Sequence, residues 1–96
     1  MYISMYIDIK DKITLGRLSE AEGGLDLEPY HAYEKGVSRI HAELHRVDEI
    51  MLMLTDMNSV NGTYLNGSRL IPSQPRIVRD GDEIRLGELT MLISFR

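Results

Sequence analysis

Short stretches in which apolar and polar residues alternate, separated by glycine and asparagine turns, make up most of this sequence. In residues 2–9 and 89–95, apolar side chains occupy every second position, as in a strand that buries one face. Asn66-Gly67 lies between two short apolar pairs and is a strong signal for a two-residue hairpin. Similar strand-like stretches occupy residues 13–15, 40–47 and 83–86. Many short strands with frequent turns predict an all-β fold, specifically an antiparallel β-sandwich.

Three further stretches predict local structure of other kinds. Residues 50–54 are apolar throughout, which is typical of a strand buried on both faces. Leu25 and Leu27 follow the Gly23-Gly24 break and predict a very short strand. A helical turn is expected near Ser19–Glu22, but no window keeps a helical period with caps at both ends.

Composition limits the classes of function. The 96 residues allow one domain, residues 1–96, with a modest core, which can stand alone or be a module of a longer protein. The absence of cysteine excludes a disulfide framework, a thiolate zinc site and a cysteine nucleophile. The longest apolar run, Ile50–Leu54, is far shorter than the ~20 residues of a membrane-spanning helix, and Met1–Ile9 does not read as a signal peptide. We therefore expect a cytoplasmic protein without membrane contact. A net charge of −4 argues against nucleic acid as a partner.

Five short motifs follow one another at the ends of the apolar runs: Gly16-Arg17, Gly36–Ala42, Ser59–Thr63, Asn66-Gly67 and Gly81–Gly87. Each motif alone is ordinary turn chemistry, but their order and spacing together resemble the forkhead-associated (FHA) domain, a reader of phosphothreonine. The resemblance spans nearly the whole chain. It implies a β-sandwich of about eleven short strands that binds through the loops at one end. The expected partners are threonine-phosphorylated protein segments, downstream of a serine/threonine kinase.

The resemblance also implies which residues bind the phosphopeptide. Arg17 is expected to make the first phosphate contact, because a planar guanidinium offers two parallel donors to two phosphate oxygens. Ser38 is expected to donate its hydroxyl to a third oxygen, and Arg39 to add charge or hold the peptide backbone. Asn61 matches the family asparagine whose amide binds the peptide main chain. Val60 is expected to contribute main-chain or apolar contacts.

Other residues of the same motifs are expected to support the loops. His41 is expected to brace the loop that carries Ser38, and Gly62 to permit a turn that a side chain would block. Three more positions share this supporting role: Gly16, Ser59 and Thr63. Arg69 is a candidate for reading the residue three positions after the phosphothreonine.

The loop between Arg17 and Ser38 is long and acidic. Carboxylates folded over a phosphate would repel it, so we expect these side chains to point away from the site. The net negative charge of the chain slows its association with an anionic partner. Binding must therefore depend on local positive groups that act within a Debye length of ~8 Å. The five carboxylates of this loop are Glu20, Glu22, Asp26, Glu28 and Glu34.

Catalysis and metal binding are less consistent with the sequence. Ser38, His41 and Asp56 are the residue types of a hydrolase triad, but an odd offset in an extended chain sends Ser38 and His41 to opposite faces, and no nucleophile elbow surrounds the serine. The segment from Asp56 to Gly67 resembles a calcium loop, but its glycine falls one place late and its last position lacks glutamate. We therefore expect no enzyme activity, no metal and no cofactor. A phosphate-independent scaffolding or assembly domain on the same fold remains the alternative.

Overall fold

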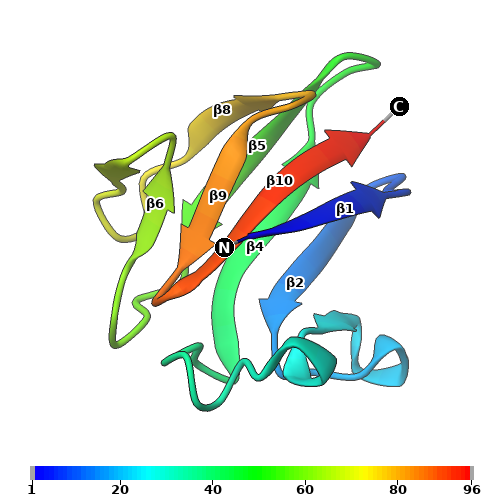
Figure 1. Cartoon of the computed structure of the whole chain (residues 1–96). Helices are drawn as coiled ribbons and strands as arrows, with labels where there is room; N and C mark the ends of the chain where they lie inside the picture. The colour runs from blue at the N-terminus through cyan, green and yellow to red at the C-terminus, as the bar shows by residue number, and fades with distance from the viewer. Residues whose placement is uncertain (1, 96) are drawn as a thin grey trace.

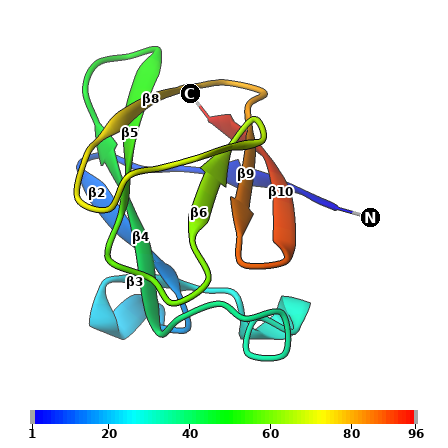
Figure 2. The same ribbon diagram turned by 90° about the vertical axis from the view of Figure 1, so that its left-hand side faces the viewer.

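The computed structural model describes residues 2–95 and shows two β-sheets packed face to face (Figure 1, Figure 2). The first is a 5-stranded sheet of order β1-β10-β9-β6-β7, and the second a 5-stranded sheet of order β3-β2-β4-β5-β8. The first sheet contains β1 (Ile3–Ile7), β10 (Leu89–Phe95), β9 (Glu83–Leu86), β6 (Thr63–Leu65) and β7 (Ser68–Arg69). The second contains β3 (Gly24–Asp26), β2 (Lys12–Gly16), β4 (Ile40–Arg46), β5 (Met51–Asp56) and β8 (Arg76–Arg79). The predicted all-β sandwich is confirmed.

Both sheets are mixed, which refines the antiparallel expectation. β1 runs parallel to β10, with Ile3 opposite Met91 and Ile7 opposite Phe95, so the first and last strands lie side by side (Figure 1). β2 runs parallel to β3, and the remaining pairs are antiparallel. Parallel neighbours need a long connection, and almost the whole chain supplies it for β1 and β10. The described residues form ten strands, against about eleven implied by the resemblance.

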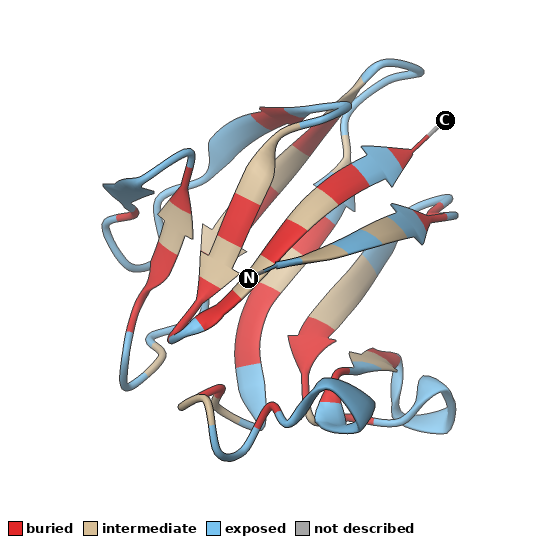
Figure 3. Cartoon of the chain, in the orientation of Figure 1, coloured by how far each residue is buried: buried red, intermediate tan, exposed pale blue. Residues whose placement is uncertain are grey.

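Alternation along the strands places the core between the two sheets (Figure 3). In β1, Ile7 is buried and its neighbour Tyr6 is exposed, as predicted. In β10, the apolar residues at alternate positions are all buried: Leu89, Met91, Ile93 and Phe95. Side chains of β2, β4, β5 and β8 complete the core from the second sheet.

Local predictions from turn residues are also confirmed. Asn66 and Gly67 have φ values of 48° and 86°, which a two-residue hairpin with right-handed strand twist requires, and they join β6 to β7. The helical turn near Ser19–Glu22 is a 3-10 turn, η1 (Glu20–Glu22), and a second, η2 (Glu28–Tyr30), follows β3. These two turns are the helical elements of the described residues, and no described helix is long and apolar enough to cross a membrane.

The expectation for residues 50–54 is wrong in one respect. β5 alternates, with Leu52 and Leu54 buried and Met53 half-buried, and Ile50, which lies just before the strand, is 71% exposed. The reason is that the second sheet packs against the first with its inner face only. β8 was not predicted from the sequence, because three of its four residues are exposed and its apolar period is too short to detect.

A bulge in β4 breaks the alternation predicted for residues 40–47. Gly16 of β2 lies opposite Ile40, and Leu15 lies opposite Ala42, so His41 is an extra residue with no partner of its own. The consequence is that His41 and Ala42 are both buried, although neighbours in a regular strand face opposite sides.

The long segment 17–39, the β5–β6 loop (57–62) and the β9–β10 turn gather at one end of the sandwich, the lower end in Figure 1. Figure 2 shows the same grouping from the side. The β1–β2, β4–β5 and β8–β9 turns lie at the opposite end. The residues predicted to bind the phosphopeptide therefore lie on loops of a single end, whereas Gly81, of the motif Gly81–Gly87, lies in the β8–β9 turn at the other end.

Candidate functional site

A hollow of about 450 Å³ lies between the segment 17–39 and the β5–β6 loop. Its lining contains all the residues predicted to bind the phosphopeptide: Arg17, Ser38, Arg39, Val60 and Asn61. Tyr33, Gly36 and Val37 complete the lining. The fold thus brings together side chains that are more than forty positions apart in the sequence.

The side chain of Arg17 is anchored through Nε and through the flat face of its guanidinium. Its Nε donates a hydrogen bond to the Val37 carbonyl at 3.1 Å, and its guanidinium lies over the Tyr33 ring, 5.1 Å from the centroid. No hydrogen bond or ion pair within residues 2–95 uses its two terminal nitrogens. A fork of two donors is therefore available to an anion in the hollow.

Gly16 supports this arrangement through the main chain. The Arg17 N–H donates to the Arg39 carbonyl at 2.9 Å, which joins the two arginine-bearing segments. A side chain at Gly16 would overlap that same carbonyl oxygen, so the close approach requires glycine.

Ser38 lies between two groups that fix its loop. Its main-chain N–H donates to Nδ1 of His41 at 3.0 Å, and its Oγ accepts a hydrogen bond from the N–H of Val60 at 3.2 Å. Val60 is 82% exposed, and the group that it uses in this hydrogen bond is its main-chain N–H. The Ser38 hydroxyl proton has no acceptor among the described residues and can be donated to a ligand.

His41 connects the two loops that form the site. Its ring is fully buried, with Nδ1 facing Ser38 and Nε2 2.9 Å from the carbonyl oxygen of Gly62. Because Nδ1 accepts a hydrogen bond from the main-chain N–H of Ser38, Nε2 must carry the hydrogen of the neutral ring. Burial lowers the pKa of His41, although the Gly62 carbonyl and the carboxylate of Asp56 act in the opposite direction.

The free energy of unfolding is expected to decrease as the pH falls below 6.5, the ordinary pKa of histidine. Below pH 6.5 the imidazole of residue 41 is protonated in the unfolded chain, whereas His41 of the folded protein stays neutral because its pKa is lower. Proton uptake therefore stabilises the unfolded state relative to the folded state until the pH falls below the folded pKa. Urea unfolding between about pH 7.5 and 5.5 measures this slope. A His31→Gln/His45→Gln variant, which keeps His41 as its only histidine, should retain the slope. A flat profile would contradict the assignment.

Asp56, which the sequence suggested only as a triad or calcium-loop residue, is a buried carboxylate that holds the β5–β6 loop. Asp56 accepts hydrogen bonds from the Ser59 hydroxyl at 2.5 Å, the Thr63 hydroxyl at 2.6 Å and the Ser59 N–H at 3.2 Å. Burial acts to raise the pKa of Asp56, but these donors and nearby His41 outweigh it, and the pKa is lowered. The spacing Asp56-x-x-Ser59 is a side-chain-to-backbone turn signal that could have indicated this role.

Gly62 and Asn61 occupy the tight part of this loop. Gly62 has φ 88°, and its N–H is bound by the Ser59 hydroxyl at 3.1 Å. Asn61 donates from Nδ2 to the Gly36 carbonyl at 2.9 Å. Its amide oxygen has no acceptor role among the described residues, so it is available to a main-chain N–H of a ligand.

Two expectations about charged residues differ from the structure. Arg39 forms an ion pair with Glu22, with Nη2 and Oε2 2.6 Å apart, so this carboxylate does not point away from the site. Arg69 does not line the hollow: its guanidinium is 5.7 Å from the centroid of the Tyr64 ring and lies against Gly62. The Glu22–Arg39 pair is not visible in the sequence, whereas the position of Arg69 beside Tyr64 follows from the two-residue Asn66-Gly67 hairpin, which pairs these two residues.

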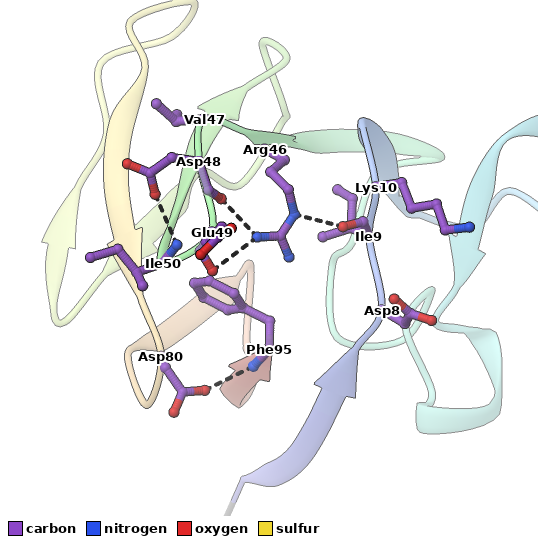
Figure 4. A pocket seen from close by; sticks show the side chains of 10 residues that line it. All are labelled: Asp8, Ile9, Lys10, Arg46, Val47, Asp48, Glu49, Ile50, Asp80 and Phe95. Atoms are coloured by element: carbon purple, nitrogen blue, oxygen red, sulfur yellow. Dashed lines mark hydrogen bonds between the residues drawn. The ribbon is translucent and has the colours of Figure 1, made fainter.

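A second hollow, of about 950 Å³, lies at the opposite end of the sandwich (Figure 4). Arg46 is its central cation, but its Nε donates to the Ile9 carbonyl at 2.7 Å and its Nη1 to the Asp48 carbonyl at 2.8 Å, so it ties the turns together. Four carboxylates surround it: Asp8, Asp48, Glu49 and Asp80. They would repel a phosphate, so the smaller hollow is the better anion site despite its size.

Residues 2–95 contain no cluster of histidine and acidic side chains that could hold a metal ion. The hollow at the loop end is lined by arginine side chains and by hydroxyl and amide groups. The geometry does not support the hydrolase-triad hypothesis, because Nδ1 of His41 accepts a hydrogen bond from the main-chain N–H of Ser38 and not from its hydroxyl.

The family model of the FHA domain matches residues 13–87. The oxoglutarate dehydrogenase inhibitor of Corynebacterium glutamicum is 34% identical over 79 residues, which cover 82% of this chain and 48% of that protein. The chain spans about half or less of the length of the curated relatives it matches.

Solved structures agree with this match. The FHA domain of FhaA, a protein of Mycobacterium tuberculosis, complexed with the intracellular domain of Rv3910, is similar at 34% identity and a TM-score of 0.61, over 85% of this chain and 78% of that one. The N-terminal FHA domain of S. cerevisiae Rad53p, in complex with a phosphothreonine peptide, is similar at 28% identity and a TM-score of 0.60, over 79% and 56% of the two chains. Since the family model covers residues 13–87 of a 96-residue sequence, the chain belongs to the FHA domain family.

Proposed function

We propose that the chain is a phosphothreonine-dependent protein–protein interaction module, which docks phosphorylated segments of partner proteins in the cytoplasm, downstream of a serine/threonine kinase. One observation carries the proposal. Arg17, Ser38 and Asn61 line a single hollow, and the terminal nitrogens of Arg17, the hydroxyl proton of Ser38 and the amide oxygen of Asn61 have no partner within residues 2–95. A phosphate and an adjacent peptide main chain need this set of partners.

The energetics of such a site fit a reversible signalling contact. Hydrogen bonds to a charged group contribute roughly 1.5–3 kcal/mol each. Two bonds from Arg17 and one from Ser38 sum to about 4.5–9 kcal/mol before the cost of ordering the peptide is subtracted. Contacts to the peptide main chain must therefore contribute to the roughly −8 kcal/mol of micromolar binding. A small apolar pocket for the threonine methyl group can add about 1–3 kcal/mol of preference over phosphoserine.

The same geometry favours binding over catalysis. A nucleophilic serine needs a base within reach of its hydroxyl, but the nearest imidazole, that of His41, is saturated by the Ser38 N–H and the Gly62 carbonyl. The Rad53p relative, which was solved with a phosphothreonine peptide, offers independent support through its similarity.

A degenerate phosphothreonine peptide library tests the proposal. The protein should retain phosphothreonine peptides at micromolar affinity and bind the phosphoserine and unphosphorylated versions of the same sequences more weakly. Equal binding of all three versions would instead identify a phosphate-independent scaffolding or assembly domain. Turnover of the peptides that disappears on Ser38→Ala would identify an enzyme.

A further inference from the structure

The acidic turn η1 lies beside one of the two arginines of the candidate site. Oε2 of Glu22 is 2.6 Å from Nη2 of Arg39, and the two side chains are 48% and 59% exposed. Arg39 lines the hollow, whereas Glu22 does not. The guanidinium of Arg39 is therefore shared between the hollow and a carboxylate at its margin.

Glu22 is presented by a closed turn and not by a loose side chain on a loop. The Ser19 hydroxyl donates to its Oε1 at 3.1 Å, and the Glu22 N–H donates to the Ser19 carbonyl at 3.0 Å. The Gly24 N–H also binds that carbonyl, at 2.9 Å, and Leu18, which precedes the turn, is buried. Since Glu22 is part of the same folded unit as Arg39, it competes with any free anion at a high effective concentration.

The two arginines thus differ before any ligand arrives. Arg17 offers both terminal nitrogens, while Arg39 is already neutralised by Glu22. A phosphate dianion must either leave that pair intact and use Arg17 alone, or displace a carboxylate that it also repels. In both cases Glu22 lowers the contribution of Arg39 to binding.

We propose that Glu22 is an affinity-determining residue of this site, acting as an internal competitor of the phosphate for Arg39. The inference rests on the proposed function. Arg39 contributes little to the affinity for the phosphopeptide while Glu22 is present, and it becomes a phosphate contact when Glu22 is neutralised. The opposite role, in which Glu22 holds Arg39 in place for the ligand, requires that the loss of Glu22 weaken binding.

Four proteins test this competition: the wild type, Glu22→Gln, Arg39→Ala and the double variant. The probe is the tightest phosphothreonine peptide from the degenerate library, titrated by calorimetry. Glu22→Gln should bind roughly three- to fivefold more tightly, which is the scale of an exposed ion pair. Arg39→Ala should cost the Glu22→Gln variant more than it costs the wild type, since the two residues act on each other.

Glu20→Gln is the matched control. Glu20 belongs to the same exposed turn, forms no ion pair within the described residues, and its replacement changes the net charge equally. It should change affinity little, and Glu22→Gln in the Arg39→Ala background should show no more than this small effect. Thermal melts of all variants check that η1 remains folded.

The outcomes separate this inference from the proposed function. If the wild type binds the phosphopeptide and Glu22→Gln binds no more tightly than Glu20→Gln, the competition is refuted and the proposed function stands. A gain that persists undiminished without Arg39 also refutes it. If none of the proteins binds phosphopeptides, the proposed function and this inference fail together.

Discussion

Replacing Arg17 by alanine is expected to weaken phosphothreonine-peptide binding by about 2–5 kcal/mol, the usual cost of removing one partner of a desolvated charge pair. The terminal nitrogens of Arg17 have no partner among the described residues, and the other arginine of the hollow, Arg39, is paired with Glu22, so no equivalent group replaces them. Stability should change little, because the side chain loses a single bond to the Val37 carbonyl and its contact with the Tyr33 ring. Calorimetry and urea unfolding measure the two effects separately.

Two variants serve as controls for Arg17. Arg17→Lys keeps the charge but not the planar fork, so it should recover only part of the lost affinity. Arg76→Ala removes the same charge from β8, where the side chain is exposed and has no ion pair among the described residues, and it should bind nearly as well as the wild type. Loss of affinity in Arg76→Ala equal to that in Arg17→Ala would show that net charge, and not a site, attracts the peptide.

The strands whose apolar residues alternate cleanly were predictable, because burial of one face imposes that period. β1 and β10 show this alternation. The Asn66-Gly67 hairpin was predictable for another reason, because its backbone needs positive φ at two successive residues. β5 was predicted as a strand, but the sequence could not reveal that one face is uncovered, since Met51 and Met53 are as apolar as Leu52.

Motif order predicted residues that lie together at one hollow, while the contacts among them were not predictable. Arg17, Ser38 and Asn61 line one hollow, although each lies on a different stretch of chain. The role of the bulge at His41 depends on the register of β2 against β4, which no local pattern encodes. The Glu22–Arg39 pair likewise depends on how the segment 17–39 folds back. From the sequence alone we expected the carboxylate of Glu22 to point away from a phosphate site, because the two negative groups repel each other.

Replacing Asp56 by alanine is expected to lower the free energy of unfolding by about 3–5 kcal/mol, because it leaves several donors without their acceptor in a buried place. The carboxylate is 1% exposed and binds the hydroxyls of Ser59 and Thr63 and the Ser59 N–H. Ser59 in turn binds the Gly62 N–H, so its release loosens the loop that carries Asn61. Urea unfolding measures the change, and peptide titration well below the unfolding midpoint should show weaker binding as well.

Asp48→Ala is the control that separates the effect of burying a carboxylate from the effect of its hydrogen bonds to a turn. Asp48 also accepts main-chain hydrogen bonds, from Ile50 and Met51, but it is exposed and lies at the opposite end of the sandwich. Water replaces the lost acceptor there, so the expected cost is about 1 kcal/mol, with unchanged peptide binding. If Asp56→Ala were no more destabilising than Asp48→Ala, the buried network would not be what orders the Asn61 loop, and the strength of phosphopeptide binding would have to depend on the Ser38 side of the site alone.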